Sequence, residues 1–345
     1  MMAGALLQVS RLKKYFPTSS GGFLGVFGQR RKIHAVDDIS FSINRSETFG
    51  LVGESGCGKS TTGLLILKLI EPNGGRILYE GRDLSTLSGQ SLRNMRRHIQ
   101  IVFQNPYASL DPRWTVEKIL CEPLLTHRIV AKHQVREKVA DLLEAVNLDA
   151  DHMYRFPHQF SGGQRQRIGI ARALAVDPGL LVADEPVSAL DVSVQAQILN
   201  LIQDLREQFQ LSILFISHDL NVVKYLSHRV GVMYMGKLVE VAPVDELFEQ
   251  PAHPYTQALL SAIPVASLHK KKERTILEGD IPSPINPEPL CRFRVRCPKF
   301  HTRCGEVEPQ RIHIGNDHFV VCHLSSETAP SGSRFIQSTS RAEKS

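Results

Sequence analysis

A glycine-rich segment near the N-terminus has the residue types and the spacing of a phosphate-binding loop. Residues 53–61 read GESGCGKST and match the pattern G-x-x-x-x-G-K-[ST]. Glycines allow successive backbone N–H groups to converge on phosphate oxygens, and the N-terminus of a following helix adds its partial positive charge. Lys59 is predicted to reach the β- and γ-phosphates, and Ser60 to bind Mg²⁺. The predicted nucleotide-binding residues of this loop are Gly53, Glu54, Ser55, Gly56, Cys57, Gly58, Lys59, Ser60 and Thr61.

Two apolar runs farther along the chain end in side chains suited to hydrolysis. LLVADEP at 180–186 places Asp184 and Glu185 after a buried strand, where we expect Asp184 to hold Mg²⁺ and Glu185 to polarise the attacking water. An acidic pair after a strand is often only a helix cap, and the glycine loop upstream favours the catalytic interpretation. His218 follows the next apolar run and is predicted to contact the γ-phosphate, the alternative being a structural histidine. The predicted catalytic residues are thus Lys59, Glu185 and His218.

A second anion-binding segment is predicted on a different helix. In FSGGQRQRIGIARAL at 160–174, Ser161 is a natural N-cap. Gly162 and Gly163 leave the N–H groups of the first turn open to an anion. One chain therefore carries two halves of a phosphate site.

The apolar pattern places these residues on a framework of alternating strands and helices. Residues 33–52 alternate and end in FGLVG, which predicts strands that lead into the glycine loop. STTGLLILKLI then predicts a buried helix that stops at PNGG. Short apolar runs predict buried parallel strands at 99–103, 180–184 and 211–217. The segment between Gln104 and Asp177 shows only helical periodicity, so we predict an α/β fold with a helical subdomain at about 105–177.

The composition is that of a folded protein with a local excess of positive charge. Of the 345 residues, 42% are hydrophobic and 22% charged, which excludes a disordered or collagen-like chain. The net charge of +6 arises within residues 1–32, which hold six basic and no acidic residues, so a broad nucleic-acid-binding face is not expected. The longest apolar stretches fall far short of the roughly 20 residues of a membrane-spanning helix. Apolar residues precede basic ones at the N-terminus, the reverse of a secretory signal, and this favours a cytosolic chain.

The ordered set of motifs resembles the ABC-type ATPases, in which SGGQ of one subunit closes on the ATP that the P-loop of another subunit holds. VFQNP resembles the Q-loop of this family, SALD at 188–191 its D-loop, and LKKYFP the segment whose aromatic ring stacks on adenine. The resemblance covers about residues 6–250 and implies a P-loop ATPase with a mixed sheet core and a helical subdomain. The nucleotide contacts that it adds are Tyr15, Gln104, Ser161, Gly162, Gly163, Gln164 and Asp191, with Gln104 joining Ser60 and Asp184 at Mg²⁺.

Finer motifs resemble the ATP-binding subunits of dipeptide and oligopeptide permeases. They are VGESGCGKST, IVFQNPYASLDPR, ADEPVSALDVSVQAQILNL, and HPYTQALLSAIP followed by IPSPINPEP and cysteines. This resemblance runs to about residue 324 and implies an ATPase that energises peptide import. It also implies a sister ATPase as heterodimer partner, two transmembrane permease subunits, an extracytoplasmic solute-binding protein, and a peripheral place on the cytoplasmic side of the inner membrane. FSGGQ instead of LSGGQ is a small departure that removes no catalytic group.

Two alternatives remain open at the level of the sequence. The importer could carry another cargo, such as nickel, glutathione or another small solute, because other subunits select it. The second alternative is a soluble ABC ATPase that acts on nucleic acid. It predicts a second P-loop, a long coiled coil or a basic face, and none of these is visible in the sequence. No nucleic-acid partner is therefore expected.

Four of the six cysteines lie close together near the C-terminus. Cys291, Cys297, Cys304 and Cys322 have the spacings C-x5-C, C-x6-C and C-x17-C. In a cytosolic protein such a group suggests one metal centre, either [4Fe–4S] or zinc, and the spacing does not decide the metal. The alternative is four free thiols in a small core. The resemblance to the permease subunits implies an iron–sulfur cluster, with zinc as the second choice.

The chain is therefore predicted to comprise three parts. Residues 1–252 form the ABC ATPase domain, residues 253–324 a small cysteine-bearing module with little apolar core of its own, and residues 325–345 a disordered tail. Four arginines near the cysteines are expected either to offset the charge of a metal cluster or to form a solvated surface. They are Arg292, Arg294, Arg296 and Arg303.

Overall fold

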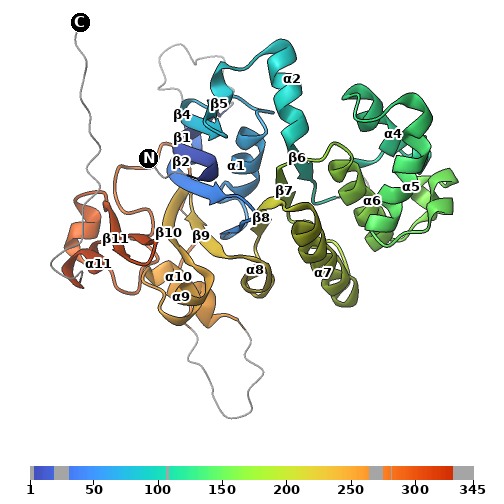
Figure 1. Ribbon diagram of the computed structural model, residues 1–345. Coiled ribbons are helices and arrows are strands. Elements are labelled where there is room, and N and C mark those ends of the chain that lie inside the picture. Colours follow the sequence, from blue (N-terminus) through green and yellow to red (C-terminus); the bar gives the residue numbers. More distant parts are fainter. Residues whose placement is uncertain (1–3, 19–30, 106–108, 264–274, 281, 329–345) are drawn as a thin grey trace, which may run out of the picture.

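Two β-sheets organise the chain (Figure 1). The computed structural model describes residues 4–18, 31–105, 109–263, 275–280 and 282–328. In this part of the chain the larger sheet has eight strands, in the order β11 (Arg311–Gly315), β12 (His318–Val321), β10 (Lys237–Pro243), β9 (Arg229–Tyr234), β3 (Thr48–Val52), β8 (Ser212–Ser217), β7 (Leu180–Asp184) and β6 (Ile99–Val102). The smaller sheet has the order β2 (Lys32–Asn44), β1 (Ala5–Pro17), β4 (Gly74–Tyr79) and β5 (Arg82–Asp83).

The larger sheet is mixed, as predicted. Its strands β9, β3, β8, β7 and β6 run parallel to one another. Every residue of β3 and β8 is buried, which is typical of parallel strands covered on both faces. β10 runs antiparallel to β9, and β12 and β11 continue the antiparallel order. The pairs in the smaller sheet are all antiparallel.

Side chains of the central strands alternate between two apolar cores. Leu180 and Val182 of β7 join a core that includes Leu65 of α1 (Lys59–Ile66) and the inner face of the smaller sheet. Leu181 joins a second core with side chains of α7 (Val192–Phe209) and α8 (Leu220–Leu226). The helix after the P-loop is therefore enclosed between the two sheets, because each strand has a period of two.

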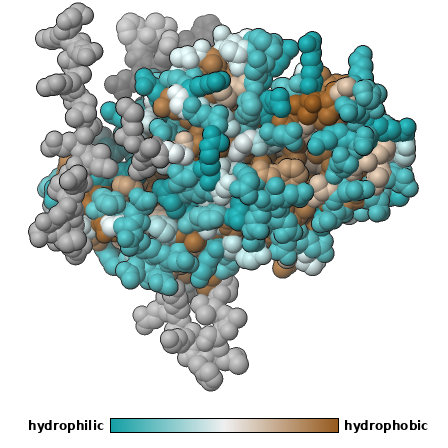
Figure 2. All heavy atoms as spheres, in the orientation of Figure 1, coloured by the Kyte–Doolittle hydropathy of each residue, from teal (hydrophilic) through white to brown (hydrophobic). Residues whose placement is uncertain are grey.

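The described residues between β6 and β7 form helices and turns, and α2 (Gly89–His98) precedes them. The helices are α4 (Val116–Thr126), α5 (Val135–Ala145) and α6 (Gly162–Leu174), with 3-10 turns η2 (Lys132–Gln134), η3 (Ala150–Tyr154) and η4 (Pro157–Gln159). They project from the sheet at the right of Figure 1. Figure 2 shows a mostly hydrophilic face with hydrophobic residues gathered over this region. The boundaries of the helical subdomain at 105–177 stay a prediction.

The C-terminal part extends the larger sheet. It contains α9 (Val244–Glu249), α10 (Pro254–Ser261), the 3-10 turn η5 (Thr302–Gly305) and α11 (His323–Thr328). Strand β12 pairs with β10, and Phe293 is 2% exposed in the main core against Tyr234 and Tyr255. The expected separate cysteine-bearing module is therefore not supported, because backbone pairing and aromatic packing join these residues to the ATPase fold.

The expected disordered tail is described only at its beginning. Residues 325–328 belong to helix α11, whereas residues 329–345 lie outside the described residues. The first part of the predicted tail is thus helical. The basic N-terminal segment is also described in part, since residues 1–3 and 19–30 lie outside the structure's described ranges.

Candidate functional site

The P-loop joins the C-terminal end of β3 to helix α1, as the sequence predicts. Three of its glycines have positive φ angles, 153° at Gly53, 76° at Gly56 and 109° at Gly58. A Cβ atom at Gly53 would lie 2.1 Å from the carbonyl oxygen of Met233, and one at Gly58 would lie 2.0 Å from that of Ala35. Only glycine fits at both positions, so the close approach of neighbouring backbone fixes the shape of the loop.

A cavity of about 500 Å³ opens over the P-loop. Its lining includes residues 54–61, Gln104 and Glu185, together with residues 33–35, 234–236 and 282–284. Its volume is typical of small-molecule sites. The side chain of Lys59 is buried, and its Nζ donates hydrogen bonds to the carbonyl oxygens of Gly53 at 2.8 Å and Glu54 at 3.0 Å. The ammonium group is therefore held at the mouth of the loop, where an anion would meet it.

The predicted magnesium and catalytic side chains converge beside the P-loop. Ser60 Oγ donates to Asp184 Oδ1 at 2.9 Å. Gln104 Nε2 donates to Glu185 Oε2 at 2.9 Å, and His218 Nδ1 lies 3.3 Å from the same oxygen. Burial raises the pKa of Asp184, partly opposed by the bond from Ser60. Four segments far apart in the sequence thus meet at the carboxyl ends of β7 and β8. They bring together the possible Mg²⁺ ligands Ser60 and Asp184 and the carboxylate of Glu185.

The second predicted anion site lies apart from this cavity. Ser161 Oγ accepts from Gln164 N at 3.3 Å, and Gln164 Oε1 accepts from Ser161 N at 3.0 Å, a capping box at the start of α6. A Cβ at Gly163 would lie 2.4 Å from a methyl of Val194 on α7. Five predicted residues of this second site are absent from the lining of the P-loop cavity: Ser161, Gly162, Gly163, Gln164 and Asp191. The two halves of the predicted phosphate site therefore do not meet within one chain.

Tyr15 is not among the residues that line the cavity, and its role in stacking on adenine stays a prediction. Its hydroxyl donates to Asp37 Oδ1 at 2.5 Å, and its ring stacks on His34 with centroids 4.0 Å apart. Burial, and after it the hydrogen bond to Asp37, raises the pKa of Tyr15. The cavity wall at this position is His34 itself. Sequence reasoning missed His34 because no motif distinguishes it from other residues of a strand.

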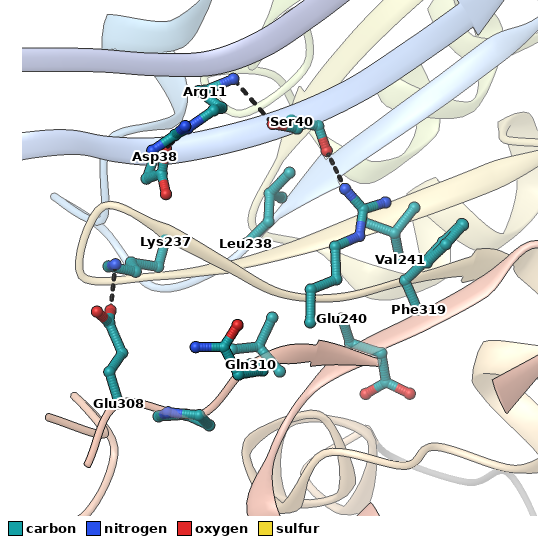
Figure 3. A pocket seen from close by; sticks show the side chains of 13 residues that line it. Arg11, Asp38, Ser40, Lys237, Leu238, Glu240, Val241, Glu308, Gln310 and Phe319 are labelled. Carbon is teal, nitrogen blue, oxygen red and sulfur yellow. Dashed lines mark hydrogen bonds and ion pairs between the residues drawn. The ribbon is translucent and has the colours of Figure 1, made fainter. Parts of the chain in front are cut away.

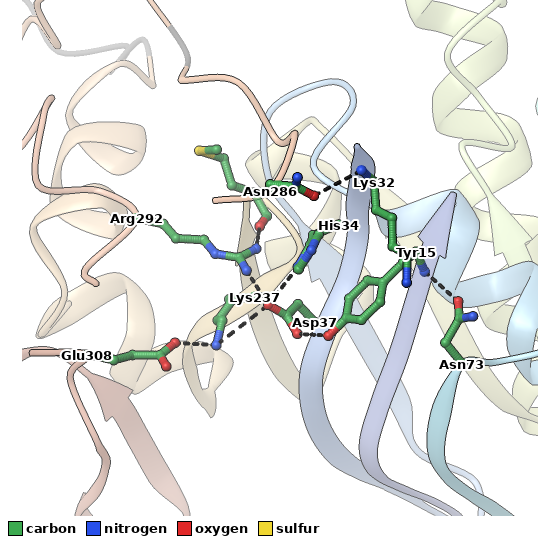
Figure 4. Close-up of polar contacts among 10 residues, drawn as sticks. Tyr15, Lys32, His34, Asp37, Asn73, Lys237, Asn286, Arg292 and Glu308 are labelled. Atoms are coloured by element: carbon green, nitrogen blue, oxygen red, sulfur yellow. Dashed lines mark hydrogen bonds and ion pairs between the residues drawn. The ribbon is translucent and has the colours of Figure 1, made fainter. Parts of the chain in front are cut away.

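Arginines of the C-terminal part bind carboxylates of the nucleotide-binding fold. Arg292 forms a buried ion pair with Asp37 and donates to the carbonyl oxygen of Met235 (Figure 4). Arg296 binds both oxygens of Glu54 in the P-loop, at 2.9 and 3.1 Å. Burial opposes ionisation of Asp37, but the bond from Tyr15 and the charge of Arg292 hold its pKa below the usual value.

These contacts correct the expected role of the arginines. Arg292 and Arg296 neutralise carboxylates of the nucleotide-binding fold, and Arg294 pairs with Glu288 at 2.6 Å. Because these three charges are matched by carboxylates, they do not act mainly as a counter-charge for a metal cluster. No sequence motif could have signalled the pairs with Asp37 and Glu54, since each joins residues at opposite ends of the chain.

The four clustered cysteines are free thiols in electrostatic contact with one another. Burial, with a smaller contribution from the other three thiols, raises the pKa of Cys291 to about 12. Burial raises the pKa values of Cys297 and Cys322 as well. Over the part of the chain that the structure describes, no group of three or more His, Cys, Asp or Glu side chains is placed to hold a metal ion. The expected [4Fe–4S] cluster, and zinc as its alternative, are therefore not supported by the geometry.

A second cavity, of about 400 Å³, is lined by residues of β1 and β2 and by residues of β10 and the C-terminal part (Figure 3). Arg11 pairs with Asp38 at 3.2 Å, and Lys237 pairs with Glu308. Arg311 donates to the carbonyl oxygen of Ser40 at 3.0 Å. Because Arg11 and Lys237 are paired with carboxylates and Arg311 is bonded to a carbonyl oxygen, this cavity offers no site comparable to the P-loop for a polyanion.

Comparison with known proteins places the chain among transporter ATPases. The family described as "ABC transporter" matches residues 36–188, and the one described as "Oligopeptide/dipeptide transporter, C-terminal region" matches residues 239–304. The chain is 51% identical over 324 residues to the oligopeptide transport ATP-binding protein AppF of Bacillus subtilis, which covers 93% of this chain and 98% of AppF. It is 49% identical over 317 residues to the dipeptide transport ATP-binding protein DppF of Escherichia coli, covering 92% of this chain and 93% of DppF.

Solved structures agree with the fold. The dimeric ATP-binding cassette MJ0796, in a post-hydrolysis state bound to ADP and Pi, matches with a TM-score of 0.61 and 26% identity, covering 69% of this chain and 98% of that chain. CbiO1 from Clostridium perfringens, part of the ABC transporter complex cbiONQ, matches with a TM-score of 0.61 and 25% identity, covering 72% and 92%.

The predicted P-loop fold of the ABC ATPase type, with a mixed sheet and helices, is thus confirmed. Among the helices that the structure describes, none is long and apolar enough to cross a membrane. Two relatives share about 50% sequence identity with this chain over more than 90% of its length, which shows the family to which it belongs. The chain belongs to the ABC transporter family and, within it, to the ATP-binding proteins of oligopeptide and dipeptide transporters.

Proposed function

We propose that this ABC ATPase, which couples ATP hydrolysis to peptide import, binds one ATP in the cavity over its P-loop. The observation that carries this proposal is the convergence of Ser60 with Asp184, and of Gln104 and His218 with Glu185, beside a loop that only glycine can form. Such an arrangement can hold a triphosphate, a divalent cation and a water molecule together. The names of the similar proteins, oligopeptide and dipeptide transport ATP-binding proteins, support the peptide cargo.

The residues of the P-loop would bind the phosphates. The N–H groups of residues 53–58 and the N-terminus of α1 offer donors and partial positive charge. Lys59 Nζ, now bonded to two loop carbonyls, would transfer its hydrogen bonds to phosphate oxygens. The hydroxyl of Ser60, the carboxylate of Asp184 and the amide oxygen of Gln104 are oxygen ligands of the kind that Mg²⁺ takes, and Mg²⁺ would neutralise charge on the phosphates.

Glu185 is placed to accept a proton from the attacking water. Its Oε2 is the common partner of Gln104 and His218, and these two side chains fix its orientation. The His218 side chain is 58% exposed, so it remains accessible to the terminal phosphate. We assign Glu185 as general base and His218 as the γ-phosphate contact on this geometry.

A complete ATP site would need a second subunit. Ser161, Gly162 and Gly163 lie outside the P-loop cavity of their own chain, yet they begin helix α6 and present open N–H groups. We infer that they close on the ATP of a sister ATPase, with Asp191 at the same interface. The heterodimer would work beneath two permease subunits on the cytoplasmic side of the inner membrane and receive cargo from a solute-binding protein. A cargo other than peptide would be selected by those partners, not by this chain.

The test is ATP turnover and peptide uptake by the assembled transporter in proteoliposomes. Glu185→Gln should retain ATP binding and lose turnover, whereas Lys59→Ala should lose both, because the first removes the base and the second a phosphate contact. Glu207→Gln, an exposed glutamate of α7, is the matched control and should behave as wild type. Turnover that survives in Glu185→Gln would refute the assignment of the base.

A [4Fe–4S] cluster at Cys291, Cys297, Cys304 and Cys322 remains a prediction, and no step of the mechanism depends on it. The electrostatic interaction among the thiols, which lie near one another, supports it. The burial that raises their pKa values and the lack of a metal-holding group in the described part of the chain count against it. Iron and acid-labile sulfide, measured after anaerobic purification, decide the question. Stoichiometric zinc, or no metal at all, would exclude the cluster.

A further inference from the structure

The motif HPYTQALLSAIP begins helix α10 of the C-terminal part, and its tyrosine reaches the P-loop. Tyr255 is 0% exposed, and its hydroxyl oxygen accepts a hydrogen bond from Glu54 N at 3.1 Å. Tyr255 is not among the residues that line the P-loop cavity. It therefore contacts the loop from the protein interior and leaves the cavity side of the loop open.

The two residues before Tyr255 fix the start of α10. His253 is the N-cap, and its Nδ1 accepts from Tyr255 N at 3.0 Å. Burial lowers the pKa of His253 to about 4, so the ring is neutral near pH 7 and one of its nitrogens can accept. Pro254 follows at the start of the helix, where a missing N–H costs nothing. His253 N donates to Glu240 of β10 at 3.0 Å, and this bond fastens the helix start to the larger sheet.

Aromatic packing holds the hydroxyl of Tyr255 in position. The centroid of its ring lies 4.7 Å from that of Tyr234 in β9 and 5.4 Å from that of Phe293. Both neighbouring rings are buried. Burial also raises the pKa of Tyr255 above its usual value, so the hydroxyl stays neutral. A ring enclosed in this way has little freedom to move, and its oxygen is therefore a fixed acceptor for the loop.

Glu54 is bonded through its N–H, its carbonyl oxygen and its carboxylate. The N–H donates to Tyr255, the carbonyl oxygen accepts from Lys59 Nζ at 3.0 Å, and the carboxylate pairs with Arg296. Lys59 would leave this carbonyl when ATP binds, and this step rests on the proposed function, because it takes Lys59 as a phosphate contact. Tyr255 and Arg296 do not line the cavity, so they would keep their bonds to Glu54 while the nucleotide is bound.

We propose that Tyr255 is a positioning residue of the P-loop, which holds the backbone at Glu54 in the shape that accepts the phosphates of ATP. Its bond is present before the nucleotide arrives. A loop that already has its bound shape loses less conformational freedom on binding, and this increases affinity. The affinity of the site for phosphates therefore depends on a side chain of the C-terminal part that never touches the nucleotide.

The experiment uses Tyr255→Phe, which removes the hydroxyl and keeps the ring. Equilibrium dialysis and competition in Mg²⁺ buffer measure the Kd of the full-length protein for ATP and for inorganic tripolyphosphate. Both Kd values should rise by the same factor, about 3- to 10-fold for the loss of one hydrogen bond, because the loop binds the phosphates of both ligands.

Turnover by the assembled transporter in proteoliposomes separates positioning from a general structural role. In Tyr255→Phe the KM for ATP should rise, and kcat should stay within about twofold of wild type, because Glu185 and His218 are unchanged. A merely structural role would lower the fraction of folded protein. In that case kcat would fall and KM would not change.

Tyr225→Phe is the matched control. It also removes one hydroxyl, which donates to Asn200 Oδ1 at 2.9 Å, but Tyr225 is an exposed residue of α8 that does not line the cavity. It should change neither Kd nor KM. Hydrogen exchange without nucleotide gives a second readout on wild type itself. The N–H of Glu54 should be better protected than that of Gly56, which is exposed in the same loop.

The results that contradict the proposal differ from those that contradict the ATP site. Unchanged Kd values in Tyr255→Phe, a fall in kcat without a rise in KM, or a Glu54 N–H that exchanges as freely as that of Gly56 would overturn the positioning role. Lys59→Ala should weaken both ligands in dialysis. If it weakens neither, the proposed ATP site itself fails.

Discussion

The ion pair between Arg296 and Glu54 gives the sharpest test of how the C-terminal part acts on the P-loop. Arg296 Nη1 and Nη2 donate to the two oxygens of Glu54 at 2.9 and 3.1 Å. The hydrogen bonds to Glu54 are the main reason why the pKa of Arg296 is raised. Replacing Arg296 by Met keeps the aliphatic part of the side chain and removes the charge, so Glu54 is left as an unpaired carboxylate in a loop that must bind a polyanion.

The magnitude follows from burial and from the number of hydrogen bonds. The side chain of Arg296 is 9% exposed and that of Glu54 is 25% exposed. Charged hydrogen bonds contribute about 1.5–3 kcal/mol, and partial exposure of Glu54 allows water to replace some of this. We therefore expect a coupling energy of about 2 kcal/mol between the two side chains, which is about thirtyfold in an equilibrium constant.

A double-mutant cycle measures this coupling. The free energy of unfolding is determined by urea denaturation for wild type, Arg296→Met, Glu54→Gln and the double variant. ATP affinity is measured on the same proteins. Arg296→Met should weaken ATP binding through charge repulsion, and adding Glu54→Gln should restore it, because the unpaired charge is then gone.

The pair of Arg294 with Glu288 is the matched control. It lies in the same segment, but Arg294 is 26% and Glu288 65% exposed, and neither lines the P-loop cavity. Its coupling should not exceed about 1 kcal/mol, as for other exposed pairs. A coupling for Arg296 and Glu54 no larger than this control, or ATP binding that Glu54→Gln does not restore, would refute the reasoning.

Three further predictions concern the loop, the cation and pH. Gly58→Ala should abolish ATP binding, measured by equilibrium dialysis, because its Cβ would lie 2.0 Å from the carbonyl oxygen of Ala35. Gly81 also has a positive φ but has open space around it, so Gly81→Ala should retain ATP binding. Ser60→Ala should raise the Mg²⁺ concentration needed for half-maximal ATPase activity by about tenfold or more, because it removes a hydroxyl beside Asp184; an unchanged Mg²⁺ curve would contradict this. Burial lowers the pKa of His318, but hydrogen bonds with Glu240 and Glu246 outweigh burial and hold it above 6.5. The charged His318 therefore stabilises the fold below pH 6.5, and this stabilisation is lost as the pH rises through its raised pKa. The free energy of unfolding, measured by urea denaturation between about pH 6 and 9, should decline with pH in wild type, and this decline should be absent in His318→Gln.

The parts of the site that could be predicted from the sequence depend on local pattern. The P-loop requires glycine, lysine and a hydroxyl at fixed spacing between a strand and a helix, and the structure has this arrangement at 53–60. Asp184 ends one buried strand and His218 follows the next, and adjacent parallel strands bring their carboxyl ends together. Apolar runs and glycine spacing therefore locate the phosphate side of the cavity.

The other side of the cavity could not be predicted, because it is made by contacts between distant residues. The pairing of residues 284–286 with β2, and of Arg292 with Asp37, leaves no periodic pattern in either segment. The adenine role of Tyr15 was implied by the resemblance of LKKYFP to a family segment, and the sequence could not indicate that the Tyr15 ring stacks on His34 and donates to Asp37. The cysteine spacing likewise could not indicate that β11 and β12 join the larger sheet.

The pairing of β12 with β10 has a consequence for the synthesis of the protein. Until residues 318–321 leave the ribosome, β10 is the last strand of the larger sheet and its outer backbone N–H and C=O groups have no partner. Such an open edge can pair with another nascent chain. The larger sheet is therefore completed only after residues 318–321 have been synthesised, and a truncation before β12 should produce aggregation-prone protein in place of a smaller soluble ATPase.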